Sequence, residues 1–441
     1  MAGSHTVSSR RVAFPGGIAP GLLRIEEGLI TAVEPGPGRG EIDFGDQVIL
    51  PGVVDTHVHI NEPGRTEWEG FDSLTRAAAR GGVTTLIDMP LNSIPATTTV
   101  AALEIKRAAA RDRCHVDVGF WGGVIPGNSG ELAGLVAAGV RGFKAFLVDS
   151  GVDEFPAASL ADLEKALRIL GPLGVPLLVH AEDPTIVSWQ ADQLREDPCA
   201  HAAWAASRAG AEEAAVARLI ELAGRCAGAV HIVHVSTAGA VEQLREARRH
   251  GVSVTAETCP HYLVLRAEDV PAGGTAFKCA PPLGSAADRE ALWRGLLDGT
   301  LSMVVSDHSP CPPDLKELES GRFDLAWGGI ASLQVSWSAV WTEARRREID
   351  LMRLVEWMSV APARLAGLTG RKGVIATGAD ADLMVVDPEA RFVIDPEQLA
   401  HRHRVTPWTG KTLSGLIVAT FLRGEPIFGE GQPSTPQGRL L

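Results

Sequence analysis

The middle of the chain alternates short apolar runs with longer stretches rich in Ala, Arg and Glu. Short apolar runs predict buried strands, and the stretches between them predict helices. Regular alternation of the two indicates βαβ units and a parallel sheet, and about eight such units make a closed (β/α)8 barrel. The predicted strands are 84–88, 116–121, 142–146, 176–180, 230–235, 252–257 and 303–306. The predicted helices are 73–80, 98–111, 157–170, 209–223, 238–250 and 286–297.

Both ends of the chain have β character instead. Short apolar runs broken by Gly and Pro occur at 12–14, 21–25, 29–33, 47–50, 373–375, 382–386, 391–394 and 416–422. Such spacing predicts small strands joined by tight turns. We therefore expect an α/β fold. Residues 51–369 form a TIM-like barrel, and residues 1–50 and 370–441 fold together as a small β-sandwich domain.

The bulk composition excludes several classes of protein. The 441 residues contain 41 Lys and Arg against 54 Asp and Glu, a net charge of −13, so binding to nucleic acid or to an anionic membrane is not expected. No apolar run is long enough to span a bilayer, and the N-terminus lacks the apolar stretch of a signal peptide. The six cysteines form no C-x-x-C pair, which predicts reduced thiols in a cytoplasmic protein.

A pair of histidines gives the first indication of chemistry. His57 and His59 follow the apolar run 48–54, which predicts a strand. Side chains two residues apart on a strand point to the same face, so the two imidazoles project together. Two converging neutral imidazoles, with Asp55 beside them, make half a metal site. The alternative is a pair of buried core histidines.

Other polar residues lie at or just beyond the ends of the predicted strands, where a barrel builds its active site. They are Lys144, His180, His234 and Asp307. Together with the first pair, they amount to more ligands than one tetrahedral zinc takes, and suit two adjacent divalent ions. His231, three residues before His234, is expected to face the opposite side of its strand. His261 is left open between the site and a turn.

Lys144 and Asp307 can each be interpreted either as part of the metal site or as residues without a catalytic role. A lysine between Phe143 and Phe146 is costly to bury as a cation. Its neutral amine can react with carbon dioxide to give an anionic carbamate that bridges two metals. The alternative is a lysine that extends to solvent. Asp307 can ligate a metal and exchange a proton with a metal-activated water, or it can cap a helix.

With these residues in view, the chain resembles the amidohydrolase superfamily, in its cyclic-amide branch of dihydroorotases, hydantoinases and allantoinases. The resemblance covers residues from about 51 to about 387. It follows the ordered motifs H-x-H, G-F-K, V-H-A-E, H-I-V-H-V-S and S-D-H-S-P. It implies N6-carboxylation of Lys144 and Asp307 as the catalytic proton carrier. The implied metal ligands are His57, His59, Lys144, His180, His234 and Asp307.

Within that branch the chain resembles allantoinases most, through segments such as HINEPGRTEWEGF and DMPLNSIPATTT. Dihydroorotases have an Arg that holds the substrate carboxylate where this chain has Asn61, an Asn at Cys279 and a His at Cys311. Hydantoinases usually have an oxyanion-stabilising Tyr where this chain has Asp149. The roles of Cys279 and Cys311 stay open.

The resemblance implies hydrolysis of the hydantoin ring of allantoin to allantoate by a metal-bridged hydroxide, in purine catabolism. It further implies two zinc ions, with cobalt, manganese or iron as alternatives, and a homo-oligomer, with a tetramer as the specific expectation. Asn61 and Asn92 are expected to bind substrate. The enzymatic alternative is a hydantoinase or dihydropyrimidinase. The other alternative is a non-enzymatic scaffold, a class that typically loses the metal ligands.

Overall fold

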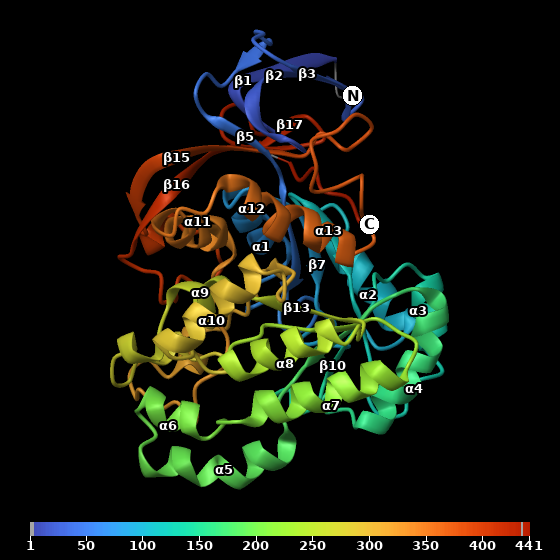
Figure 1. The fold of residues 1–441 in the computed structure, drawn as a ribbon, viewed down its shortest axis with the longest axis vertical. Helices are drawn as coiled ribbons and strands as arrows, with labels where there is room; N and C mark the ends of the chain where they lie inside the picture. The colour runs from blue at the N-terminus through green and yellow to red at the C-terminus, as the bar shows by residue number, and fades with distance from the viewer. Residues whose placement is uncertain (1–3, 434) are drawn as a thin grey trace.

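The structure, a computed structural model, describes residues 4–433 and 435–441 and centres on a barrel of parallel strands with helices outside it (Figure 1). Two hydrogen-bonded groups make up the barrel wall, β6-β7-β8 and β9-β10-β11-β12-β13-β14. Because β8 and β9 are pieces of one interrupted strand, the barrel has eight strands. The strands are β6 Val53–Val58, β7 Val83–Asp88, β8 Asp117–Phe120, β9 Gly122–Gly123, β10 Phe143–Phe146, β11 Leu177–His180, β12 Val230–Ile232, β13 Val254–Thr258 and β14 Met303–Val304.

The barrel closes just beyond the carboxyl ends of β14 and β6. Val58 pairs with His308 in a parallel bridge, and the His59 N–H donates to the His308 carbonyl at 2.9 Å. This closure brings the first and last strands of the barrel together, although they are about 250 residues apart in the chain. The predicted TIM-like barrel is therefore confirmed.

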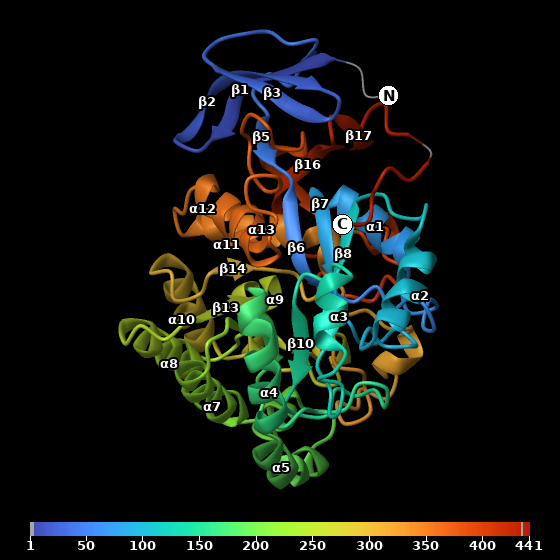
Figure 2. The same cartoon turned by 90° about the vertical axis from the view of Figure 1, so that its right-hand side faces the viewer.

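The helices pack around the strands, as Figure 2 shows from the side. They are α1 Phe71–Arg80, α2 Val100–Ala110, α3 Leu132–Ala137, α4 Leu160–Leu170, α5 Pro184–Glu196, α6 His201–Ala206, α7 Ala211–Arg225, α8 Ala238–Arg249, α9 Pro260–Val264, α10 Ala286–Leu297, α11 Ser336–Arg346, α12 Leu351–Val355 and α13 Ala361–Leu365. Across the described residues, every helix is too short or too polar to traverse a bilayer.

Helix α4 shows how the sequence specifies these elements. Ser159 and Asp162 form a capping box at its start, which satisfies main-chain N–H groups that the helix leaves unpaired. The buried side chains Leu163, Ala166, Leu167 and Leu170 follow a helical spacing and lie on one face against the barrel. Apolar periodicity thus accounts for both the helix and its orientation.

The two ends of the chain share one eight-stranded sheet at one end of the molecule, so they form the predicted small β-sandwich domain (Figure 1). Strand β5 lies between β1 and β15, which places the N-terminal segment directly against the C-terminal one. The strands are β1 His5–Phe14, β2 Gly17–Glu26, β3 Leu29–Pro35, β4 Ile42–Asp43, β5 Val48–Pro51, β15 Leu383–Val393, β16 Thr412–Leu422 and β17 Glu425–Phe428.

Two strand predictions are wrong in detail. The run 48–54 is not one strand, because it breaks at Gly52 into β5 of the small sheet and β6 of the barrel. A Cβ at Gly52 would lie 2.3 Å from Thr84 Oγ1, so only glycine fits where the chain crosses between the two sheets. Residues 373–375 form no strand, since Gly373 has a φ of +73° and the segment is irregular.

A buried charge network joins the barrel to the small domain. Lys372 is buried and its ammonium lies 2.7 Å from Asp117, 2.8 Å from Asp380 and 2.6 Å from Asp382. Asp117 begins barrel strand β8, whereas Asp382 immediately precedes β15 of the small sheet. Arg423 adds a second cation 2.6 Å from Asp117. One lysine therefore forms ion pairs with carboxylates from both domains at their junction.

Candidate active site

The six predicted ligands all lie at one end of the barrel, near the carboxyl ends of its strands. His57 is the second-last residue of β6, Lys144 is within β10, and His180 ends β11. The other three follow their strands by a few residues: His59 after β6, His234 after β12 and Asp307 after β14.

Three of the six form a tight cluster. His57, His59 and Asp307 each present a ligand atom, and these atoms lie within 4.8 Å of one another. Asp307 Oδ1 is 3.2 Å from His57 Nε2 and 3.5 Å from His59 Nε2. Burial and the charge of Lys144 hold the pKa of His57 well below its usual value, so this imidazole is neutral and has a lone pair for a metal.

The remaining imidazoles continue from this cluster. The His57 ring is 5.5 Å from the His234 ring, which is 4.6 Å from the His180 ring, measured between centroids. His180 also stacks on Phe146 at 4.6 Å. His234 Nδ1 is buried and has no partner among the described residues. This free nitrogen is consistent with a metal ligand.

Lys144 is fully buried and its ammonium has no hydrogen-bond partner among the described residues. The Nζ atom lies 4.8 Å from the centre of the Phe146 ring. Burial lowers the pKa of Lys144 to about 8, although Glu257 and Asp307 oppose the shift. A larger fraction of reactive neutral amine is therefore present than for an exposed lysine. Together with the imidazole and carboxylate donors, this orphaned amine fits a two-metal site bridged by a carbamate.

Left-handed backbone turns aim two of these side chains. His234 has a φ of 41° and Asp307 a φ of 43°, both unusual for residues other than glycine. Simple strand alternation therefore fails after β12, and the expectation that His231 faces away is wrong. The Nε2 atom of His231 is 3.0 Å from Glu257, which also contacts His57.

Three carboxylates lie behind the ligands, and the sequence singled out only Asp55 among them. Glu257 lies 2.5 Å from His57 Nδ1, and Glu182 lies 2.6 Å from His180 Nε2. Asp55 accepts the N–H groups of His57 and Ser306, which ties β6 to the segment that bears Asp307. Such carboxylates set the tautomer and orientation of ligand imidazoles. In the sequence, only their position could have indicated this role: Glu257 ends a predicted strand, and Glu182 follows one by two residues.

Five of the six predicted ligands, all except Lys144, line a cavity of about 80 Å³. Asn92 also lines it, with its Nδ2 atom 3.5 Å from His59 Nδ1. The side-chain oxygen Oδ1 of Asn92 is unpaired among the described residues. Asn61 is buried but is not among the described lining residues, and its Nδ2 atom donates to the Pro310 carbonyl at 3.4 Å. The structure thus brings only Asn92 to the cavity.

Neither Cys279 nor Cys311 is among the described residues that line this cavity. Burial raises the pKa of Cys279 to about 12 and that of Cys311 to about 11, so both are protonated thiols. The only tyrosine, Tyr262, donates to the Pro281 carbonyl at 2.6 Å. His261 is buried near Asp307 and Cys259, and the three present ligand atoms within 4.8 Å of one another.

A buried lysine holds one wall of the active-site cavity. Residues 327–329 form this wall, which we call the roof. The Lys316 ammonium donates to the carbonyls of Lys278 at 3.2 Å, Trp327 at 3.0 Å and Gly329. Gly329 cannot gain a side chain here, because a Cβ would lie 2.4 Å from the Ser309 carbonyl. One cation therefore holds the roof main chain in place.

Replacing Lys316 with methionine is expected to raise KM by about tenfold, because the roof loses roughly 1–2 kcal/mol of hydrogen bonding. Metal content should stay unchanged, since no predicted ligand contacts Lys316. Steady-state kinetics and elemental analysis test this, with the exposed Lys165→Met as control. Equal KM values in the two variants would contradict the role.

The sequence matches the amidohydrolase family over residues 48–427. The chain therefore belongs to the amidohydrolase family, as its motifs indicated. Among its relatives, it is 50% identical to an allantoinase of Streptomyces avermitilis over 98% of this chain and 97% of that one. It is 43% identical to an allantoinase of Saccharomyces cerevisiae, covering 95% of this chain and 92% of that one.

Solved structures give the same fold. An L-hydantoinase (dihydropyrimidinase) from Arthrobacter aurescens superposes with a TM-score of 0.93 at 30% identity, covering 98% of this chain and 99% of that one. A D-hydantoinase superposes with a TM-score of 0.90 at 28% identity, covering 99% and 98%. The sequence is thus more similar to the allantoinases than to these hydantoinases, whose architecture this chain shares.

Proposed function

We propose that this protein hydrolyses the hydantoin ring of allantoin to give allantoate. The observation that carries the proposal is the near-complete match to allantoinases at 43–50% identity, in a chain whose six predicted ligands lie at one end of the barrel. The intact ligand set argues against a scaffold without activity. Sequence identity favours allantoin over the hydantoins of the structural relatives.

The proposed metal site comprises His57, His59, His180, His234, Asp307 and the carbamate of Lys144. Two divalent ions, when bound, supply an acidified water and polarise the scissile amide carbonyl. We propose zinc, while cobalt, manganese or iron also suit imidazole and carboxylate donors.

The chain's own residues supply proton transfer and orientation. Asp307 is proposed to take the proton of the attacking water and to deliver it to the departing ring nitrogen, because its carboxylate lies between the two histidines at the cavity. Glu257 and Glu182 keep His57 and His180 in the tautomers that expose a lone pair to the metals.

Asn92 is the proposed substrate contact. Its unpaired carbonyl oxygen and its amide N–H groups can pair with the N–H and C=O groups of an uncharged ring. Asn61 is the weaker of the two proposed contacts, because it lies outside the cavity lining. Arg208 lines the cavity but is engaged by Glu182 at 2.6 Å, so it is not free to select a substrate carboxylate.

We also propose how the protein is organised. We assign residues 51–369 to the catalytic barrel and residues 1–50 and 370–441 to the small domain. A cytoplasmic location is supported by six free cysteines. We propose a homo-oligomer, which Trp189 supports because it is 84% exposed on α5, a helix without a buried residue. A tetramer is the specific expectation from the family resemblance.

A substrate panel tests the function. We expect kcat/KM for allantoin to exceed that for hydantoin by at least about tenfold, because Asn92 can pair with the ureido groups that hydantoin lacks. Dihydroorotate turnover should be negligible, since its carboxylate finds no free arginine. The assay follows allantoin loss and allantoate formation at neutral pH with added zinc, cobalt or manganese.

Two outcomes separate the alternatives. Faster turnover of hydantoin or dihydrouracil with all three metals would indicate a hydantoinase or dihydropyrimidinase. No hydrolysis of any of the four compounds by metal-loaded protein would indicate a scaffold.

A further inference from the structure

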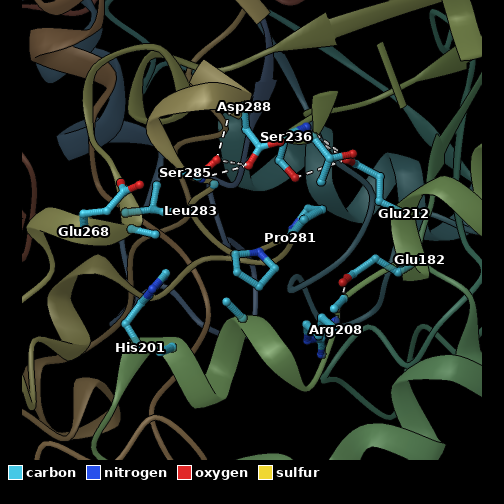
Figure 3. Close-up of a pocket in the computed structure, with 18 residues that line it drawn as sticks. Glu182, His201, Arg208, Glu212, Ser236, Glu268, Pro281, Leu283, Ser285 and Asp288 are labelled. Carbon is cyan, nitrogen blue, oxygen red and sulfur yellow. Dashed lines mark hydrogen bonds and ion pairs between the residues drawn. The ribbon is translucent and has the colours of Figure 1, made fainter. Parts of the chain in front are cut away.

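A second cavity lies beside the active-site cavity and is much larger, at about 450 Å³ (Figure 3). Helix α6, the start of α7 and the segment 281–285 enclose it, and we call it the His201 chamber. Glu182 and Arg208 line both cavities, so their ion pair, 2.6 Å long, forms the wall between them. A volume of this size is typical of a site for a small organic molecule.

His201 is the unexplained polar group of this chamber. It projects from the start of α6 and is only 4% exposed, yet neither ring nitrogen has a hydrogen-bond partner among the described residues. Burial lowers the pKa of His201 to about 4, so the ring is neutral at physiological pH. A neutral imidazole offers one N–H donor and one acceptor nitrogen. Native proteins rarely leave such a buried group unpaired.

Two other carboxyl groups of the chamber, the buried Glu212 and the half-buried Asp288, are already occupied. The Glu212 carboxylate accepts from Ser236 N–H at 2.9 Å and Thr237 N–H at 2.8 Å. The Asp288 carboxylate accepts from Ser285 N–H and Ala238 N–H, both at 2.9 Å. His201 is therefore the polar group left to orient a ligand.

The remaining wall selects against an anion. Ala202, Ala205, Pro281 and Leu283 give it an apolar surface. Arg208, the one Lys or Arg among the described lining residues, is paired with Glu182. Glu268 and Asp288 add carboxylates at the rim, which disfavour an anion. The apolar surface and the neutral imidazole of His201 favour a neutral molecule, because burying a charge against apolar walls is costly.

We propose that the His201 chamber binds an uncharged small molecule that carries an amide or urea group. Such a group offers both an N–H donor and a carbonyl acceptor, so it can pair with a His201 nitrogen in either neutral tautomer, while the apolar walls cover the rest of the molecule. This site is separate from the catalytic cavity. The inference depends on the proposed function only in the choice of allantoin as probe.

The test counts allantoin molecules bound to full-length, zinc-loaded Asp307→Asn protein, in which the proposed proton carrier is removed so that the probe survives. Calorimetric titration is repeated after adding Ala205→Trp, which fills the chamber, or Ala206→Trp, on the exposed side of the same helix. We expect one allantoin per chain to be lost with Ala205→Trp and retained with Ala206→Trp.

Two further arms test the chemistry. His201→Phe keeps a ring of similar size but removes both nitrogens, and should weaken chamber binding by about tenfold. Allantoate has the same ureido groups and a carboxylate, and should bind the chamber at least about tenfold more weakly than allantoin.

Equal stoichiometry in the Ala205→Trp and Ala206→Trp proteins would overturn the inference, as would unchanged chamber affinity in His201→Phe. Allantoin hydrolysis by the unaltered protein is measured separately. Hydrolysis without chamber binding refutes the chamber alone, and chamber binding without hydrolysis refutes the proposed function alone.

Discussion

Lys144→Ala is expected to lose bound metal and ring hydrolysis together. Lys144 is the single lysine in the proposed ligand set, and its amine is buried without a partner among the described residues. If its carbamate bridges the two ions, its removal opens both coordination spheres. Mutation of residues that only support a ligand already costs about 10–100-fold in metal affinity or activity. Loss of the bridge should therefore lower activity by more than about 100-fold.

Elemental analysis and kinetics check this result. Unaltered, unchelated protein should contain about one to two divalent ions per chain, and Lys144→Ala should contain fewer. Acetate or propionate should partly restore both metal and turnover by filling the gap. Lys316→Met is the matched control, because it also removes a buried lysine whose pKa burial lowers to about 8, and it should keep its metal. A Lys144→Ala protein with normal metal content and turnover would show that the lysine is incidental.

Lys372→Met is expected to destabilise the protein by about 3–5 kcal/mol, because it removes a buried cation that contacts three carboxylates. Asp117 keeps Arg423 and Asp380 keeps Arg371, but Asp382 is left without an ion-pair partner among the described residues. Asp117, Asp380 and Asp382 are each at most 3% exposed, and the Lys372 ammonium lies within 2.8 Å of all three. Although burial lowers the pKa of Lys372, the three carboxylates together raise it above its usual value, so the lysine is charged.

Chemical denaturation measures the free energy of unfolding. Arg371→Met is the matched control, since Arg371 also pairs with Asp380 but its side chain is 56% exposed, and such pairs contribute about 0–1 kcal/mol. Lys372→Arg should recover part of the loss by restoring a cation. Equal destabilisation by Lys372→Met and Arg371→Met would mean that the buried network adds nothing beyond a surface ion pair.

Local patterns were sufficient to predict the architecture. Apolar periodicity marks α4 and its neighbours, and the strand ends mark His57, Lys144 and His180, because side-chain direction follows from backbone geometry within a few residues. The fold class and the family could be predicted for the same reason, since the motifs stand in a fixed order along the strands.

Strand alternation does not predict side-chain direction correctly where the backbone leaves regular strand geometry. The left-handed φ values of His234 and Asp307 redirect side chains that simple alternation would place elsewhere. The break at Gly52 depends on Thr84 of the neighbouring strand, which no local pattern encodes.

The fold class, the family and the set of candidate ligands therefore follow from the chain's local patterns. Several of the contacts that orient those ligands do not, because they join residues far apart in sequence. Glu257 reaches His57 across 200 residues, and the Ser306 N–H reaches Asp55 across 251. The contact of Lys372 with Asp117 likewise joins distant parts of the chain. Barrel closure brings these groups together, and packing leaves the His201 chamber open beside the site, so only the folded chain reveals them.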